Sequence, residues 1–173
     1  MPMHGHYDLY PITQSLTQVL SEMDEPAVEG GFVSQSGLSG AIYALTGSKE
    51  AADHNNASNS INNFGVHVGY QNFSHSVGYA AGIGLLHNMT DVDAIRQIVD
   101  NNHGYAISVP GVSANAGLYF GPFGLTGDYV TATRQFGVND YAWQSHQQTR
   151  GAKPSATGID TSYKFDYKGH HIS

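Results

Sequence analysis

The stretch "YFGPFGLTGDYVTA", residues 119–132, decides the fold class. Counted in twos from Ala114, the apolar side chains that lead up to its Gly-Pro-Phe-Gly corner are Ala116, Leu118 and Phe120. Beyond the corner, Leu125, Tyr129 and Thr131 continue the same face. Thr126 and Asp128 alternate with them on the opposite face. A period of two is the pattern of a β-strand with one apolar face. The stretch therefore predicts a hairpin that is apolar on one face and small and polar on the other.

The same alternation recurs along most of the chain and predicts seven strands. They span residues 27–35, 38–46, 63–71, 76–86, 112–120, 125–134 and 157–167, and the sequence leaves room for an eighth before Tyr10. The corners near residues 36, 73 and 122 are short, as hairpins prefer. The links 47–61, 87–111 and 135–154 are long and polar. Alternating short turns and long loops are typical of a transmembrane β-barrel.

The second long link contains a helix signal, "TDVDAIRQIVDNN" at residues 90–102. Thr90 is the expected N-cap, and Asp91 and Asp93 would lie in the positive first turn of the helix. We expect a short helix over residues 90–101. Its shared apolar face, packed inward or against the rim, would be formed by Ile95, Ile98 and Val99.

Composition narrows the class of protein. The chain of 173 residues suits one domain, and only 12% of its residues are charged, about half the usual share. A net charge of -7 without a basic stripe argues against a nucleic-acid partner. The absence of cysteine excludes disulfides and thiolate metal sites. The chain also has neither a 20-residue apolar segment nor a signal-peptide pattern at its start.

The polar faces of the predicted strands favour a membrane barrel over a soluble sandwich. An exposed face in water usually carries Lys and Glu, but four of these faces contain no charged residue. We therefore expect an all-β, antiparallel, up-and-down transmembrane β-barrel with one short loop helix. One continuous outer surface in contact with lipid would include Val66, Val68, Tyr79, Ala81, Ile83, Leu118 and Leu125. The alternative is a soluble β-rich binding or adhesin-like module.

Four segments resemble one family. They are "YPITQSLTQVL" (10–20), "YAAGIGLLHNMTD" (79–91), "YFGPFGLTGDYVTATRQF" (119–136) and "GAKPSATGIDTSYKF" (151–165). They resemble the LbtU-family siderophore porins. The resemblance implies an outer-membrane barrel of about 16 strands that imports an iron–siderophore complex without a plug domain.

The chain departs from that family pattern in its length. It supplies about half of the strands, lacks a signal peptide and ends in "GHHIS" (169–173) in place of an aromatic strand. We therefore expect residues 1–173 to be a single barrel segment, a fragment of a longer outer-membrane protein. Such a fragment would form an open, curved sheet or a distorted barrel with unpaired edges.

No pattern of catalytic residues is present. The chain has no Gly-x-Ser-x-Gly motif and no nucleophile–base constellation, so we expect no enzyme, and we expect no cofactor or metal site. The candidate lumen-facing residues are His67, Asp128, Arg134, Asp160, Lys164 and Asp166. Their charges would either pair across neighbouring strands or shape the field that selects a solute. The expected partners are membrane lipid and a small solute such as a ferric siderophore.

Overall fold

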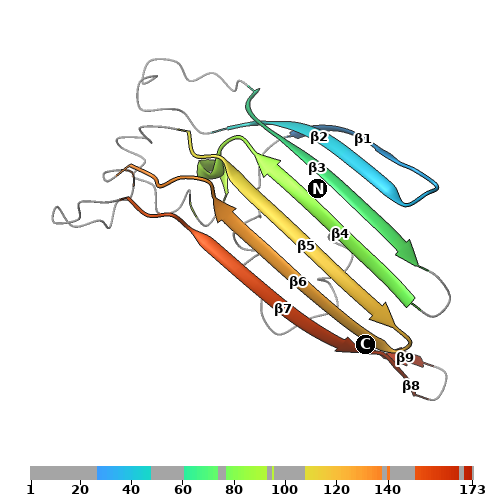
Figure 1. The fold of residues 1–173 in the computed structure, drawn as a ribbon. Helices are drawn as coiled ribbons and strands as arrows, with labels where there is room; N and C mark the ends of the chain where they lie inside the picture. Colours follow the sequence, from blue (N-terminus) through green and yellow to red (C-terminus); the bar gives the residue numbers. More distant parts are fainter. Residues whose placement is uncertain are drawn as a thin grey trace.

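The computed structural model describes residues 27–47, 61–73, 77–92, 95, 108–137, 140, 151–167 and 170–172, with backbone only from residue 165 onward. Seven strands form one antiparallel sheet in which each strand pairs with its neighbours in sequence (Figure 1). They are β1 (Ala27–Val33), β2 (Leu38–Thr46), β3 (Ile61–Phe73), β4 (Val77–Leu86), β5 (Gly111–Phe120), β6 (Phe123–Ala132) and β7 (Ser155–Tyr163). A separate ribbon consists of β8 (Phe165–Tyr167) and β9 (His170–Ile172). The seven strands predicted from the alternation are thus confirmed.

Glycines with positive φ close two of the tight turns. Gly37 has a φ of 92° and donates its N–H to the Ser34 carbonyl at 3.0 Å, which turns β1 into β2. Gly121, with a φ of 55°, leads the two-residue loop between the paired residues Phe120 and Phe123. Side chains other than glycine rarely adopt this left-handed conformation. The corners predicted near residues 36 and 122 are therefore set by local backbone geometry, whereas the corner predicted near residue 73 runs into residues 74–76, which lie outside the described part of the chain.

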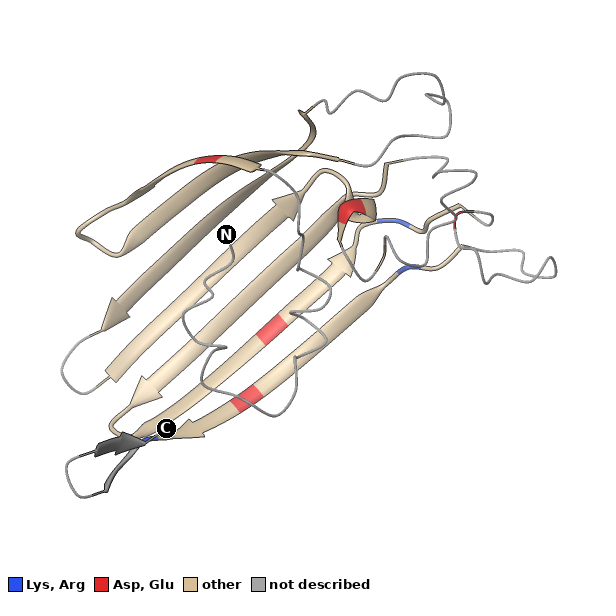
Figure 2. Cartoon of the chain, turned by 180° about the vertical axis from the view of Figure 1, so that it is seen from behind, with Lys and Arg blue, Asp and Glu red and all other residues tan. Residues whose placement is uncertain are grey.

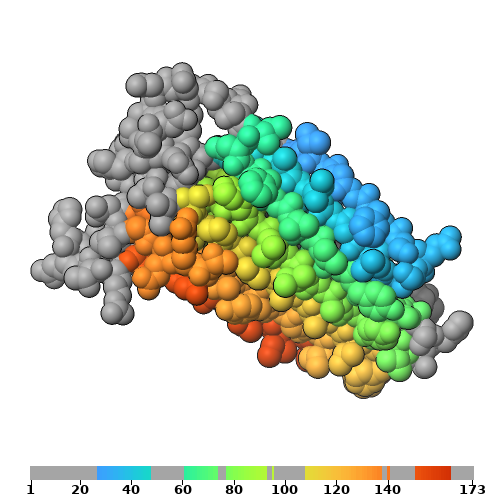
Figure 3. Space-filling model, turned by 45° about the horizontal axis from the view of Figure 1, so that its top comes forward, coloured from blue at the N-terminus to red at the C-terminus, as the bar shows by residue number. Residues whose placement is uncertain are grey.

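The alternation sorts the side chains of the sheet onto two faces. We call the exposed one the apolar face, and Figure 3 shows the strands following one another across the surface from β1 to β7. Its large residues are Val28, Phe32, Leu38, Ile42, Ile61, Phe64, Val68, Tyr70, Val77, Tyr79, Ile83, Leu85, Leu118, Phe120, Phe123, Leu125, Tyr129, Ile159 and Tyr163. Val66 and Ala81 share this face, and the seven residues expected on one surface are indeed together on it.

The opposite side, which we call the polar face, is lined mainly by small and polar residues. They include Glu29, Ser39, Tyr43, Asn63, Gly65, His67, Gly69, Gly78, Ala80, Gly82, Gly84, Ser113, Asn115, Gly117, Tyr119, Gly124, Thr126, Asp128, Gly158, Asp160 and Ser162. The strand register aligns these positions across the sheet, so the face is continuous from β1 to β7.

The sheet is open, with β1 and β7 as its two edges. The described residues therefore do not form a closed barrel, and the expected open sheet agrees with their strand order (Figure 1). The candidate eighth strand before Tyr10 lies outside the described residues.

Two strands end earlier than predicted because prolines flank the hydrogen-bonded ladder. β6 stops at Ala132, where Pro110 and Pro154 accept backbone bonds from Thr133 and Ala132 but have no N–H to return. β7 stops at Tyr163, beyond which Pro122 limits pairing in the same way. Arg134 and Asp166 consequently lie outside the sheet, contrary to the predicted strands 125–134 and 157–167.

The helix predicted over residues 90–101 is described only in part. Met89–Asp91 form a 3-10 turn whose N-cap is Asn88, not Thr90, and Ile95 is in α-helical conformation, while residues 93 and 94 lie outside the described part of the chain. Ile95 is buried as expected, while residues 96–101, including Ile98 and Val99, lie outside the described residues. No helix in the described part of the chain is long and apolar enough to cross a membrane.

Candidate functional site: the polar face and its mouth

Side chains project little from the polar face, because its larger side chains lie over glycines of neighbouring strands. A Cβ added at Gly65 would sit 2.2 Å from the Tyr43 ring, and one at Gly82 would sit 2.8 Å from Nε2 of His67. His67 lies half-buried in the middle of this face, opposite Gly84 of β4. The predicted lumen-facing position of His67 therefore corresponds to a polar-face position of β3.

Within the seven strands the charged residues are the acidic Glu29, Asp128 and Asp160, whereas the described Lys and Arg residues lie beyond the strand ends, as do Asp91 and Asp140 (Figure 2). Asp160 pairs with Thr126, two residues from Asp128, so the two carboxylates are diagonal neighbours. Arg134 follows the end of β6 and donates a hydrogen bond from its guanidinium to the Ser108 carbonyl. Lys164 follows the opposite end, one residue past β7.

The structure thus brings together only part of the predicted charge set. Asp128 and Asp160 share the polar face, whereas Arg134 and Lys164 flank its two ends. Asp166 lies in β8, where only the backbone is described. The register therefore gives no support to a simple ladder of alternating cross-strand charges.

A buried polar network lies at the end of the polar face where the long loops begin, an end that we call the mouth. The Asn63 amide donates to the Asn88 carbonyl at 2.8 Å and to a carboxylate oxygen of Asp91, and its Oδ1 accepts from the Asn88 N–H at 3.0 Å. Asn88 in turn accepts from the N–H groups of Thr90 and Val109. Asn63, Thr90 and Asp91 are at most 1% exposed. These bonds tie the segment after β4 to β3 and to the start of β5.

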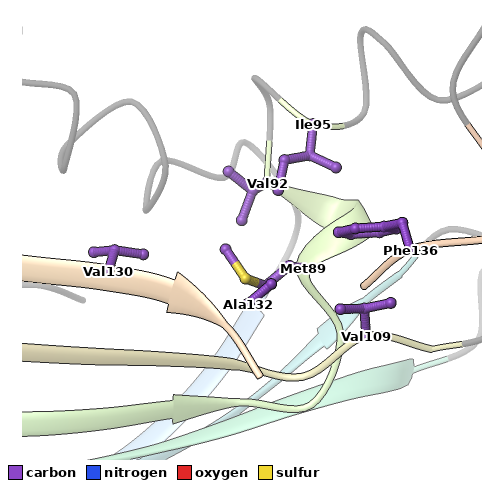
Figure 4. Packing of buried hydrophobic residues seen from close by; sticks show 7 residues of the cluster. All are labelled: Met89, Val92, Ile95, Val109, Val130, Ala132 and Phe136. Carbon is purple, nitrogen blue, oxygen red and sulfur yellow. The ribbon is translucent and has the colours of Figure 1, made fainter. Parts of the chain in front are cut away.

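Next to this network lies the mouth cluster, which consists of Met89, Val92, Ile95, Val109, Val130, Ala132 and Phe136 (Figure 4). Val130 and Ala132 are polar-face positions at the end of β6. A Cβ added at Gly111, a polar-face position of β5, would lie 2.6 Å from the Met89 sulfur. The mouth cluster therefore packs on the polar face of the sheet. Its residues do not cover the apolar face.

The connection after β6 contributes to the same mouth. Phe136 donates its N–H to the Ala152 carbonyl at 2.8 Å, just before β7. Asp140 is buried and accepts the Gly137 N–H at 2.6 Å. A Cβ at Gly151 would overlap the Phe136 carbonyl oxygen at 1.6 Å, so only glycine fits this approach. The described residues of the connections after β4 and after β6 thus pack at the same end of the polar face.

Sequence reasoning did not identify Asn63, Asn88 or Phe136 as functional candidates. The local signal was present at Asn88, which precedes a Thr and an Asp as an N-cap does, but Asn63 reads in sequence only as one more polar residue of an alternating strand. The described residues contain no group of three or more His, Asp or Glu side chains that could hold a metal ion.

No protein-family model, curated protein or solved structure matches this chain. The resemblance to the LbtU-family siderophore porins therefore stays a prediction carried by the segments quoted above.

Proposed function

We propose that the seven-stranded sheet is an arc of the wall of an outer-membrane β-barrel, a porin-like protein that passes a small solute such as a ferric siderophore. One observation carries the proposal. The apolar face is exposed over all seven strands, and its strand positions contain no Asp, Glu, Lys, Arg or His; His87, one residue past β4, stacks on Phe64 at the end of this face.

Water is a poor solvent for such a face. Soluble monomers rarely expose contiguous apolar patches larger than a few hundred Å². Here side chains such as Ile42, Ile83 and Ile159 are 54–75% exposed on three strands distributed across the sheet. A lipid environment removes the unfavourable hydration of these side chains, while the small polar face suits an aqueous lumen.

Strand lengths support the same proposal. A tilted strand needs about 9–11 residues to cross the hydrocarbon core of a bilayer. β2 and β7 have 9 residues, and β4, β5 and β6 have 10 each.

The distribution of aromatic rings also fits a membrane boundary. At the turn end of the apolar face, the rings of Phe120 and Phe123 are 5.6 Å apart, and those of Phe123 and Tyr163 are 4.9 Å apart. Tyr70 and Tyr79 lie 5.9 Å apart at the same end. Aromatic girdles mark the interfaces of transmembrane barrels.

Strand direction constrains how the wall would be completed. Every pairing in the sheet is antiparallel, so β1 and β7 point the same way. An entirely antiparallel barrel therefore requires an odd number of further strands between β7 and β1. Two copies of this arc inserted in the same orientation would meet in parallel and would not satisfy that rule.

Flotation with liposomes tests the proposal. The protein refolded into phosphatidylcholine vesicles is expected to float with them on a density gradient after washes in high salt and carbonate. A chain that is folded and monodisperse in buffer without detergent, and that stays at the bottom of the gradient, would overturn the proposal and favour the soluble binding module.

A further inference from the structure

The imidazole ring of His67 lies close to the backbone of the sheet near the middle of the polar face. Its Cε1, Nε2 and Cδ2 atoms are 3.1, 2.8 and 3.8 Å from the positions that a Cβ would take at Gly69, Gly82 and Gly84, respectively. Larger residues at the first two positions would collide with the ring, whereas glycine lets it approach β3 and β4 closely. Because His67 is only half-buried, part of its side chain remains accessible.

Polar side chains of the neighbouring strands surround this ring. From β5, Oδ1 of Asn115 lies 2.5 Å from the Cβ position of Gly82. Oγ of Ser113, from the same strand, lies 2.6 Å from the Cβ position of Gly84. From β2, Oγ of Ser39 lies 3.0 Å from the Cβ position of the third glycine. We call this group the His67 platform, and it consists of His67, Ser39, Ser113 and Asn115.

The platform has hydrogen-bonding capacity that the sheet does not use. Asn115 is exposed, and the other three members are half-buried. The side chains of His67, Ser113 and Asn115 make no hydrogen bond to another described residue. Ser39 donates to the Gly69 carbonyl at 3.3 Å, which leaves the lone pairs of its oxygen to accept. Since a neutral imidazole, a carboxamide and a hydroxyl each offer donors and acceptors, a ligand that satisfies the platform must both donate and accept.

We propose that the His67 platform binds a carbohydrate. A neutral sugar ring lies on the imidazole, and its hydroxyl groups bond to the carboxamide and the two serine hydroxyls around it. Every sugar hydroxyl both donates and accepts, which matches the unused capacity of the platform. The inference does not rest on the proposed function, because the polar face meets water both in an aqueous lumen and on a soluble sheet.

The charges of the polar face favour a neutral ligand. Asp128 pairs with Asn115 across β5 and β6, so a carboxylate borders the platform. The seven described strands contain no Lys or Arg. An anionic ligand would therefore meet a like charge on this face and find no cation to pair with. An ammonium group only donates hydrogen bonds, so it leaves the donors of the Asn115 carboxamide unused.

Ligand-observed NMR tests the site on the full chain. The protein is refolded in lauryldimethylamine oxide, a detergent without a sugar headgroup. The methyl pyranosides of glucose, galactose and mannose are titrated in turn, and glucuronate is the anionic comparison. Saturation-transfer difference signals give the Kd of each ligand.

The matched variants are Ser113→Ala and Ser162→Ala. Both remove a polar-face hydroxyl that lies over a glycine of a neighbouring strand, 2.6 Å from the Cβ position of Gly84 and 2.5 Å from that of Gly124. Only Ser113 belongs to the platform. A third variant, Gly82→Ala, places a Cβ 2.8 Å from Nε2 of His67 and 2.5 Å from the carboxamide oxygen beside it.

At least one pyranoside is expected to give a saturable signal. Ser113→Ala should raise its Kd about three- to tenfold, as the loss of one neutral hydrogen bond does, and Ser162→Ala should leave the Kd unchanged. Gly82→Ala is expected to displace the imidazole ring and abolish saturation. If Gly82→Ala does not fold, the serine pair still decides.

The inference is overturned if none of the three pyranosides saturates, if the two serine variants have equal Kd values, or if glucuronate binds more tightly than the glucoside. A chain that is soluble without detergent and binds the sugar would overturn the proposed membrane wall and leave the carbohydrate site standing. The two proposals therefore fail in different experiments.

Discussion

A pair of arginine substitutions on adjacent residues separates the membrane wall from a soluble sheet. Ala81 lies on the apolar face near the middle of β4, and Ala80 lies beside it on the polar face. Ala81 is exposed and pairs with Tyr70 and Ala116, whereas Ala80 is half-buried and pairs with Gln71 and Gly117. The two sites share residue type, strand and depth, so the face is the main variable.

In a bilayer, Ala81→Arg places a charge in hydrocarbon. Arg on the lipid face of a barrel costs roughly 2–4 kcal/mol at the midplane, which lowers the folding equilibrium constant about 30- to 700-fold. Ala80→Arg can extend its guanidinium into an aqueous lumen, and we expect it to change the free energy of unfolding by less than about 1 kcal/mol.

A soluble sheet predicts the reverse order. There Ala81 faces water, so an arginine would change stability by about 0.5 kcal/mol or less, and the half-buried Ala80 would be the costlier site. The assay is guanidinium unfolding of each variant in large unilamellar vesicles, followed by fluorescence of the single tryptophan. A larger loss for Ala80→Arg than for Ala81→Arg would refute the reasoning.

Further predictions concern turns and charges. Gly37→Ala is expected to destabilise the protein more than Gly121→Ala in the same unfolding assay. A Cβ at Gly37 would lie 1.8 Å from the Gln71 carbonyl oxygen, whereas a Cβ at Gly121 would have no neighbour within 4 Å. Equal losses of stability would contradict this steric argument. At both sites the positive φ adds roughly 1–2 kcal/mol for a non-glycine residue. In a conducting barrel, Asp128→Asn with Asp160→Asn should shift the reversal potential of a salt gradient toward anion permeation, since both carboxylates lie on the polar face. An unchanged potential would mean that these carboxylates do not face the ion path.

The sheet could be predicted from the sequence because the alternation of apolar and polar residues along each strand is a local pattern. In residues 64–70 of β3 and 77–85 of β4 every second residue is apolar and the intervening ones are small or polar, so period alone assigns the two faces there. The turn at Gly121–Pro122 is equally local. The strand ends at Ala132 and Tyr163 were missed because they depend on Pro110, Pro154 and Pro122, which lie on neighbouring strands or loops.

The mouth could not be predicted because it is formed by contacts between distant segments. Asn88 and Thr90 are both good helix caps and lie two residues apart. Asn88 is the cap in the structure, where its side chain also accepts from Val109, 21 residues later. Asn63 meets its partners across 25 residues or more. Alternation places Asn63 on the polar face but says nothing about what packs on it.

The most direct test of the lipid-facing wall is a scan of spin labels along β4 of the protein in liposomes, using single cysteines at positions 78–85. Collisions with oxygen, which concentrates in lipid, should peak at Tyr79, Ala81, Ile83 and Leu85, the apolar-face positions. Collisions with a water-soluble nickel chelate should be lowest at those same positions. High nickel accessibility at Ala81 and Ile83 would contradict the proposal that this face is the lipid-facing wall of an outer-membrane barrel.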